Sequence, residues 1–351
     1  MYVHTVKFST RFVVLRGLAM TSELNCDAVF EMKNLYYTGN YYDCSLKATK
    51  LKEKTTSIDV KLQCDYFIHR SNIAQGMSSI TLADISASEA SPELFAVRMV
   101  AEYLERTEKR QCNPFHTLHY AHFTLADIVQ NFTKIANRFH WNSAVIFAIA
   151  KIFHHEQVLL LFIILRLFGG VNTDNKYEES LRYLHVCEKS LDCLYLTTLS
   201  LLAVGQVVEA KKTVAKMHRL DDDNVIAHMA SAAVKMFLGN ENIQDAFYIF
   251  KELQEKYGSS ALLQNALLCC FVLQGKYDDA EEMANDNMKN FSQNPEVFIN
   301  AIVVSLVQGK SYETVKRYVH LMKEKFACHP WTTDLKEKEN EFDKLCETFT
   351  A

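Results

Sequence analysis

Apolar positions recur every three or four residues along most of the chain, from about residue 24 to 104 and from about 175 to 326. This period is typical of amphipathic helices that bury one stripe of side chains against a neighbour. Four glycines each end one periodic stretch and open the next, at spacings of 34, 36 and 34 residues. They are Gly205, Gly239, Gly275 and Gly309. The pattern predicts short helices in pairs, joined by tight turns.

The residues that follow these glycines also repeat. Gly275-Lys-Tyr-Asp-Asp-Ala280 has a tyrosine two positions after the glycine and an alanine five positions after it, and Ala210 and Ala246 follow their own glycines at similar distances. A period near 34 with this turn is typical of tetratricopeptide-type repeats. We therefore expect an all-α, tetratricopeptide-like helix–turn–helix solenoid, curved or ring-like, whose surface holds another protein.

The same turn recurs in weaker form earlier in the chain. Gly39-Asn-Tyr starts one turn, with Cys44 in place of the small alanine, and Gly76 marks a degenerate turn 37 residues later. Pro92, followed by an acid, predicts the start of another helix. Tyr177 lies in a restored repeat turn, 28 residues before Gly205.

The periodicity divides the chain into segments. Residues 20–331 are predicted to form the repeat solenoid, which is interrupted by irregular segments at 110–124 and 157–170. The charged helical segment 332–351 is predicted to cap the solenoid, since a terminal repeat needs a polar outer face.

Residues 1–19 differ from the rest and are expected to be a disordered extension that precedes a folded protein starting at Met20. They carry Lys7, Arg11 and Arg16 and no acid. That composition is also compatible with a mitochondrial transit peptide, which is the less favoured interpretation.

Composition supports the helical prediction. Hydrophobic residues make up 49% of the chain, while only 4 prolines and 10 glycines occur, too few for the frequent turns of a sandwich or barrel. The net charge of −4 predicts no nucleic-acid partner, because such a surface needs clustered basic residues. The apolar run 158–165 is too short to span a membrane and is expected to be a buried helix.

The ten cysteines include no Cys-x-x-Cys pair. Cys187 and Cys193 lie six residues apart, and Cys269 and Cys270 are adjacent. Most cysteines fall within apolar helical patterns, so we expect reduced core thiols of a cytosolic protein.

Two motifs superficially suggest enzymes. Gly309-Lys-Ser311 resembles the end of a phosphate-binding loop, but position 304 is Val instead of Gly and the motif follows a predicted helix instead of a strand. His155-Glu156 lacks the second histidine of a zinc-protease helix, because position 159 is Leu. We therefore expect no enzyme and no cofactor.

One group could bind a metal: Cys112, His116, His119 and His122, with histidines at every third position. Pro114 lies within the group, however, and the segment interrupts the repeat pattern. A solvated loop is the favoured interpretation and a metal site the alternative.

The surface expected to bind a partner is the concave face formed by the first helix of each pair. Counting back from the turn glycines gives inward positions that are mostly apolar, together with Glu296. They are Ile226, Met229, Ala233, Met236, Leu262, Asn265, Cys269, Val272, Ile299, Val303 and Leu306. An apolar wall favours a permanent partner with a buried hydrophobic segment over an acidic peptide tail, although packing against the second helices could account for some of these residues.

Several segments together resemble the epsilon subunit of coatomer, the coat of Golgi vesicles. They are Phe30-Glu-Met-Lys-Asn-Leu-Tyr-Tyr-Thr-Gly39, Pro92-Glu-Leu-Phe-Ala-Val-Arg98, Leu220-Asp-Asp-Asp, Gln244-Asp-Ala-Phe-Tyr248 and Lys338-Glu-Asn-Glu-Phe342. They occur in the family's order and cover roughly residues 24–104 and 172–347.

The resemblance implies a non-catalytic subunit of the cytosolic COPI coat, which returns cargo from the Golgi to the endoplasmic reticulum. It also implies that the repeats close around the C-terminal part of the alpha coatomer subunit, and that the protein reaches the membrane only through the assembled coat. The alternative is another repeat scaffold, such as a co-chaperone or a membrane-fusion attachment protein.

Relative to that family, residues 1–19 look extra, and the segments 111–123 and 157–170 look inserted. Retained intron sequence or a lineage-specific loop would each account for the two internal segments.

Overall fold

The structure is a computed structural model, and it describes residues 26–86, 91–112, 142–155, 176–327 and 329–349. All regular secondary structure in these residues is helical. The chain forms two compact units, which meet in sequence between Met77 and Ser78. The predicted solenoid over 20–331 includes both units, and its continuity across residue 77 stays a prediction.

The first unit contains a helix over residues 26–37, α2 (Tyr41–Lys54) and α3 (Ile58–Ala74). Met32, Cys44 and Phe67 are buried in its core. Cys44 thus occupies the predicted place of the small alanine, fully buried in the helix contact. Arg70 is also buried, and its guanidinium lies 4.5 Å from the ring centre of Tyr36, where a cation–π contact offsets part of its lost hydration.

The second unit begins with α4 (Ser78–Asp84), α5 (Pro92–Cys112), α8 (Ser143–His155) and α10 (Lys176–Leu184). The predicted helix start at Pro92 is confirmed, with the Ser91 hydroxyl 3.0 Å from Glu93 Oε2. Arg98 of α5 donates to the carbonyl oxygen of Leu82 at 2.9 Å, which satisfies an acceptor near the C-terminal end of α4.

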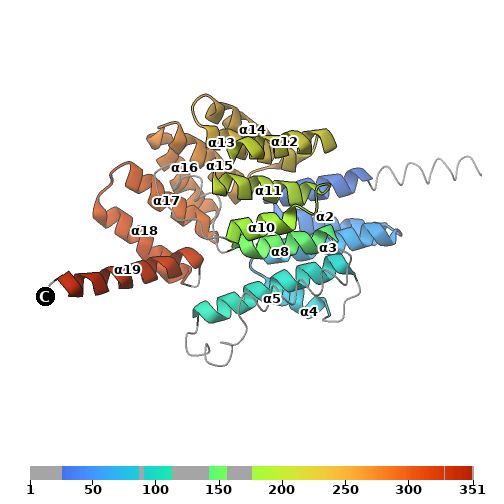
Figure 1. The fold of residues 1–351 in the computed structure, drawn as a ribbon, viewed down its shortest axis with the longest axis horizontal. Helices are drawn as coiled ribbons and strands as arrows, with labels where there is room; N and C mark the ends of the chain where they lie inside the picture. The colour runs from blue at the N-terminus through green and yellow to red at the C-terminus, as the bar shows by residue number, and fades with distance from the viewer. Residues whose placement is uncertain (1–25, 87–90, 113–141, 156–175, 328, 350–351) are drawn as a thin grey trace, which may run out of the picture. The chain divides into compact units, whose positions relative to one another are not determined.

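Four helix pairs follow in sequence, as the glycine spacing predicts (Figure 1). They are α11 (Leu191–Val204) with α12 (Val207–Leu220), α13 (Val225–Leu238) with α14 (Asn242–Tyr257), α15 (Ala261–Leu273) with α16 (Tyr277–Asn290), and α17 (Pro295–Val307) with α18 (Tyr312–Lys325). Each helix packs on the next along the chain, and α11 also packs on α13, and α15 on α17.

The turn glycines have the backbone conformation that the repeat requires. At Gly205 φ is +86°, and its N–H donates to the Leu202 carbonyl while Gln206 N–H donates to Leu201. This pair of bonds is the Schellman arrangement, which satisfies carbonyls at a helix end and favours glycine at positive φ. The same two bonds occur at Gly275 and Gly309, so three of the four turns share one geometry.

The remaining turn, at Gly239, accounts in part for the 36-residue spacing between Gly239 and Gly275. Gly239 has φ +74° and ψ −166°, outside the left-handed helical region, and Asn240 after it also has a positive φ of +52°. Helix α14 begins only at Asn242, three residues after the glycine, whereas α16 begins two residues after Gly275. The longer turn takes up part of the added sequence.

The predicted close helix contacts are confirmed. Ala210, Ala246 and Ala280 are each fully buried in the second helix of their pair. The second helices bury one stripe only, while the first helices are apolar and buried on most sides. First helices therefore lie between other helices, and second helices keep a solvent-facing side.

The last helix, α19 (Pro330–Phe349), corresponds to the predicted capping segment and begins two residues earlier than expected. Trp331 packs against the core formed by Phe298, Ile299 and Met322 of the last helix pair. The irregular segment predicted at 110–124 starts too early, because α5 continues through Cys112. The rest of that segment, the segment 157–170 and residues 1–19 lie outside the described residues.

Replacing Ala280 with Trp is expected to destabilise the protein by about 1–3 kcal/mol, because the larger ring overpacks the α15–α16 contact. The free energy of unfolding in urea, followed by circular dichroism, measures the change. Asp279→Trp, at the exposed neighbouring position, is the matched control. An unchanged midpoint for Ala280→Trp would contradict the buried placement.

Replacing Gly275 with Ala is expected to destabilise by about 1–2 kcal/mol, because an L-residue is strained in a left-handed conformation. A Cβ at this position would meet no atom within 4 Å, so strain is the main cause expected. Gly275→Asn should lose less stability than Gly275→Ala, since asparagine tolerates this conformation better. Equal stability of the Gly275→Ala variant and the native protein in urea would contradict the left-handed conformation of Gly275.

Candidate partner-binding surface

The structure buries most of the residues predicted to line the concave face. The buried residues come from three first helices: Ile226, Met229, Ala233 and Met236 of α13, Asn265, Cys269 and Val272 of α15, and Ile299 of α17. Packing within the chain accounts for their burial. Their contact with a partner stays a prediction.

Three predicted residues remain accessible. Leu306 in the last turn of α17 is 60% exposed, and Leu262 and Val303 are partly buried. Burial of a leucine side chain is worth about 1.5–3 kcal/mol. Leu306 therefore offers a partner more apolar area than the other positions of the predicted set.

The sequence could not separate accessible from buried positions on these helices. On α15 the residues from Ala266 to Cys270 are all buried, which covers more than a full turn. A helix that is hydrophobic all round has no single apolar stripe, so its period does not identify the face left open.

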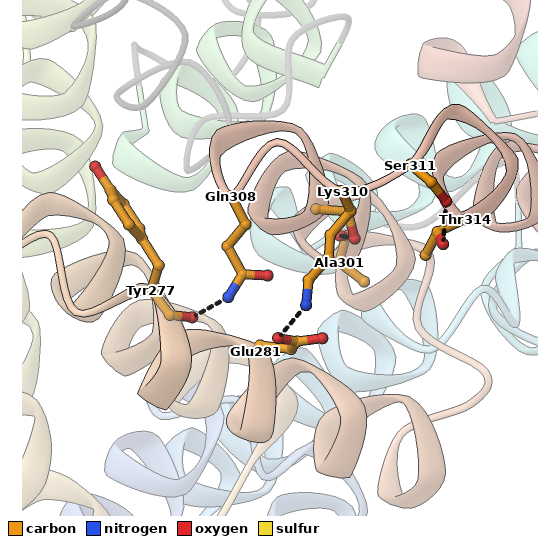
Figure 2. Close-up of polar contacts among 8 residues, drawn as sticks. Tyr277, Glu281, Ala301, Gln308, Lys310, Ser311 and Thr314 are labelled. Atoms are coloured by element: carbon orange, nitrogen blue, oxygen red, sulfur yellow. Dashed lines mark hydrogen bonds and ion pairs between the residues drawn. The ribbon is translucent and has the colours of Figure 1, made fainter.

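The turn at Gly309 is built by contacts between neighbouring pairs (Figure 2). Gln308 Nε2 donates to the Tyr277 carbonyl at 2.9 Å, and Lys310 Nζ lies 2.9 Å from Glu281 Oε2. Ser311 Oγ lies 3.0 Å from Thr314 Oγ1 in the first turn of α18. The lysine and serine of the phosphate-loop resemblance thus serve the repeat turn, and the turn follows helix α17, as predicted.

A similar glutamine contact joins the preceding pairs. Gln274, which also directly precedes a turn glycine, donates through Nε2 to Gln244 Oε1 of α14 at 2.9 Å. Both glutamines reach the first turns of the previous second helix. These bonds help to fix the register of one repeat against the next, and sequence reasoning had not singled them out.

A second accessible apolar surface lies on α19. Phe342, Leu345 and Phe349 are 65%, 57% and 87% exposed, and their spacing of three and four residues places them on one side of the helix. An ion pair of Lys323 with Glu339 at 2.7 Å connects α19 to α18. Beyond Leu335, every described residue of α19 is exposed. Only its first turns therefore act as a cap.

Glu296, one of the predicted inward positions, lies beside His329, and both side chains are partly buried. His329 Nε2 is 3.7 Å from Glu296 Oε1, and the backbone N–H of Trp331 donates to His329 Nδ1 at 3.3 Å. Burial raises the pKa of Glu296 to about 7 and lowers the pKa of His329 to about 4. Both changes favour the uncharged forms, as expected where hydration is lost.

The metal candidate Cys112, His116, His119 and His122 cannot be placed, because its histidines lie outside the described residues. Among the described residues, no three His, Cys, Asp or Glu side chains gather in a way that could hold a metal ion. No described helix is both long and apolar enough to cross a membrane. The run 158–165 is not among these residues.

Paired helices, glycine turns and buried alanines define a tetratricopeptide-like repeat protein. The solved structure of the Cut9–Hcn1 hetero-tetramer of APC/C supports this fold, with a TM-score of 0.55 at 14% identity over 93% of this chain and 57% of that chain.

The Coatomer epsilon subunit family matches residues 25–117 and 163–350, and the chain belongs to this family of non-enzymatic coat subunits. It is 26% identical to coatomer subunit epsilon of Caenorhabditis elegans, over 91% of this chain and 97% of that protein. It is 25% identical to coatomer subunit epsilon-1 of Arabidopsis thaliana, over 94% and 100%. The predicted resemblance is thereby confirmed, and the unmatched residues 118–162 overlap both segments predicted to be inserted.

The Glu296–His329 pair predicts opposite pH effects in two variants. Glu296 in the folded state keeps its proton up to about pH 7, above its ordinary 4.5, so its contribution to stability is lost as pH rises through that window. His329 in the folded state stays neutral down to about pH 4, below its ordinary 6.5, so its contribution is lost as pH falls.

Relative to the native protein, Glu296→Gln should therefore gain stability as pH rises from about 4.5 to 7, and His329→Gln should lose stability as pH rises from about 4 to 6.5. Urea unfolding at several pH values across this range measures both slopes. Parallel curves for all three proteins would contradict the burial of the pair.

Proposed function

We propose that the protein is a structural subunit of the COPI coat that binds and stabilises the alpha coatomer subunit through that subunit's C-terminal domain. The family match over both repeat units is the observation that carries this proposal. In this role the protein serves Golgi-to-ER retrograde and intra-Golgi vesicle transport. It lies on the cytosolic side of Golgi membranes and COPI vesicles and is attached there only through the assembled coat.

The repeat architecture supports a holding role. Each first helix is fixed between neighbours, so the apolar residues it leaves exposed are presented on a rigid support. Rigid presentation lowers the ordering cost that binding must overcome. A hydrophobic segment of the alpha subunit would cover Leu306 on the predicted concave face. Leu262 and Val303, the other two accessible residues of the predicted set, would add to this contact.

The contacts at the Gly309 turn favour a binding role over a catalytic one. Lys310 is already paired with Glu281, and Gln308 with the Tyr277 carbonyl. The polar groups of this turn therefore hold the repeats together, which leaves apolar contact as the main source of affinity for a partner.

Leu306→Asp is expected to weaken retention of the alpha subunit's C-terminal domain about tenfold or more, because a buried leucine contributes about 1.5–3 kcal/mol. The measurement is a titration of the immobilised domain with the purified full chain. Val208→Asp is the matched control: Val208 is 68% exposed on a second helix, outside the predicted surface, and should bind as the native protein does.

Failure of the native chain to be retained at micromolar concentration would reject the coat proposal and favour another repeat scaffold. If the native chain and the Leu306→Asp variant bind the domain equally well, the coat proposal stands and only the proposed binding surface around Leu306 is rejected. In that case the exposed stripe Phe342, Leu345 and Phe349 is tested next with Leu345→Asp.

A further inference from the structure

The turn between α10 and α11 brings two cysteine side chains together. Cys187 lies in the turn and Cys193 in the first turn of α11, and the two thiols are close enough for each to shift the pKa of the other. Both pack in one apolar cluster with Ile146 of α8 and Leu184 of α10. Six residues of sequence thus hold two sulfur atoms side by side.

The two thiols differ in access and acidity. Cys187 is partly exposed, while Cys193 is fully buried. Interaction with the Cys193 thiol, together with a hydrogen bond from the backbone N–H of Ser190, lowers the pKa of Cys187, whereas the same thiol–thiol interaction and burial raise the pKa of Cys193. The N-terminal end of α11 adds a partial positive charge near Cys187, which also favours a thiolate.

We propose that Cys187 and Cys193 form an oxidation site, at which Cys187 is oxidised by a hydroperoxide and Cys193 then closes a disulfide within the turn. In the first step the Cys187 thiolate attacks one peroxide oxygen and the O–O bond breaks, which gives a sulfenic acid and hydroxide. In the second step Cys193 attacks the Cys187 sulfur, the S–O bond breaks, and water leaves with the thiol proton. Two thiols are oxidised and one hydrogen peroxide is reduced to two water molecules.

Other described cysteines lack this combination of contact and access. Cys44 is fully buried in the first unit, and burial raises its pKa to about 11. Cys269 and Cys270 are adjacent on α15 and fully buried, with pKa values also raised by burial. Buried thiols with raised pKa values react slowly with peroxide, so the turn should be oxidised in preference to these sites.

The disulfide also changes a contact to a neighbouring helix. The Cys193 thiol donates to the Ser143 carbonyl, at an Sγ–O distance of 3.6 Å, at the start of α8. Disulfide formation removes that proton, so the carbonyl loses its donor. Oxidation at the α10–α11 turn should therefore loosen the first turn of α8, where the Ser143 carbonyl loses this hydrogen bond. The inference does not depend on the proposed coat function.

The protein sequence supplies a direct test. Lys189 lies between the two cysteines, so trypsin separates them into the peptides 183–189 and 190–211. The reduced full chain is treated with hydrogen peroxide, remaining thiols are alkylated, and the digest is analysed by mass spectrometry. The expected result is a disulfide-linked pair of these two peptides, which disappears after dithiothreitol treatment.

Cys346→Ser is the matched control, because it removes an exposed cysteine on α19 and should leave the linked peptides unchanged. Cys187→Ser should abolish them. Cys193→Ser should stop the reaction at a Cys187 sulfenic acid that dimedone captures, and Cys193→Ala replaces it if circular dichroism shows that the serine variant does not fold.

In the native chain, amides at the start of α8 should exchange faster with deuterium after oxidation than before. Absence of the 183–189 to 190–211 link in folded native protein, under peroxide that already modifies Cys26 or Cys346, would overturn the proposal. Linked peptides that persist in Cys187→Ser would do the same.

Discussion

The repeats of this protein depend on one constraint: no helix pair can bury its own apolar surface. The first helices α13, α15 and α17 are apolar on most sides, so each needs its own second helix and the neighbouring pairs to cover it. The fully buried alanines set how closely the paired helices approach, and the glycine turns set where each helix stops. Stability is therefore shared between neighbouring repeats, as expected for a stacked architecture.

Much of this fold could be predicted from the sequence because its strongest signals are local. Gly205, Gly275 and Gly309 mark the turns, since the left-handed conformation at a helix end favours glycine, and the helix on either side follows from the apolar period. The altered turn at Gly239 was visible as a longer spacing, but its geometry, with Asn240 at positive φ, could not be deduced from spacing alone.

The binding surface was harder to predict, for a physical reason. The counting rule selected Ile226 and Cys269 along with Leu306, yet the first two are enclosed by the chain's own helices and the third is not. Accessibility depends on which neighbouring helix covers each side, which is a long-range property. The packing of Cys187 beside Cys193, and the partial burial of Glu296 beside His329, depend in the same way on the folding of turns and chain ends that carry little periodic signal.

The contrast between first and second helices has a consequence for how such a chain can diverge. A position buried between neighbouring helices accepts few side-chain volumes, whereas the solvent-facing side of α12, α14 or α16 needs only to remain polar and helical. Relatives that are about one quarter identical over nearly the whole length can therefore keep one backbone arrangement. Substitutions are expected to accumulate along the outer ridges of the second helices, where they can change surface charge without disturbing the stack.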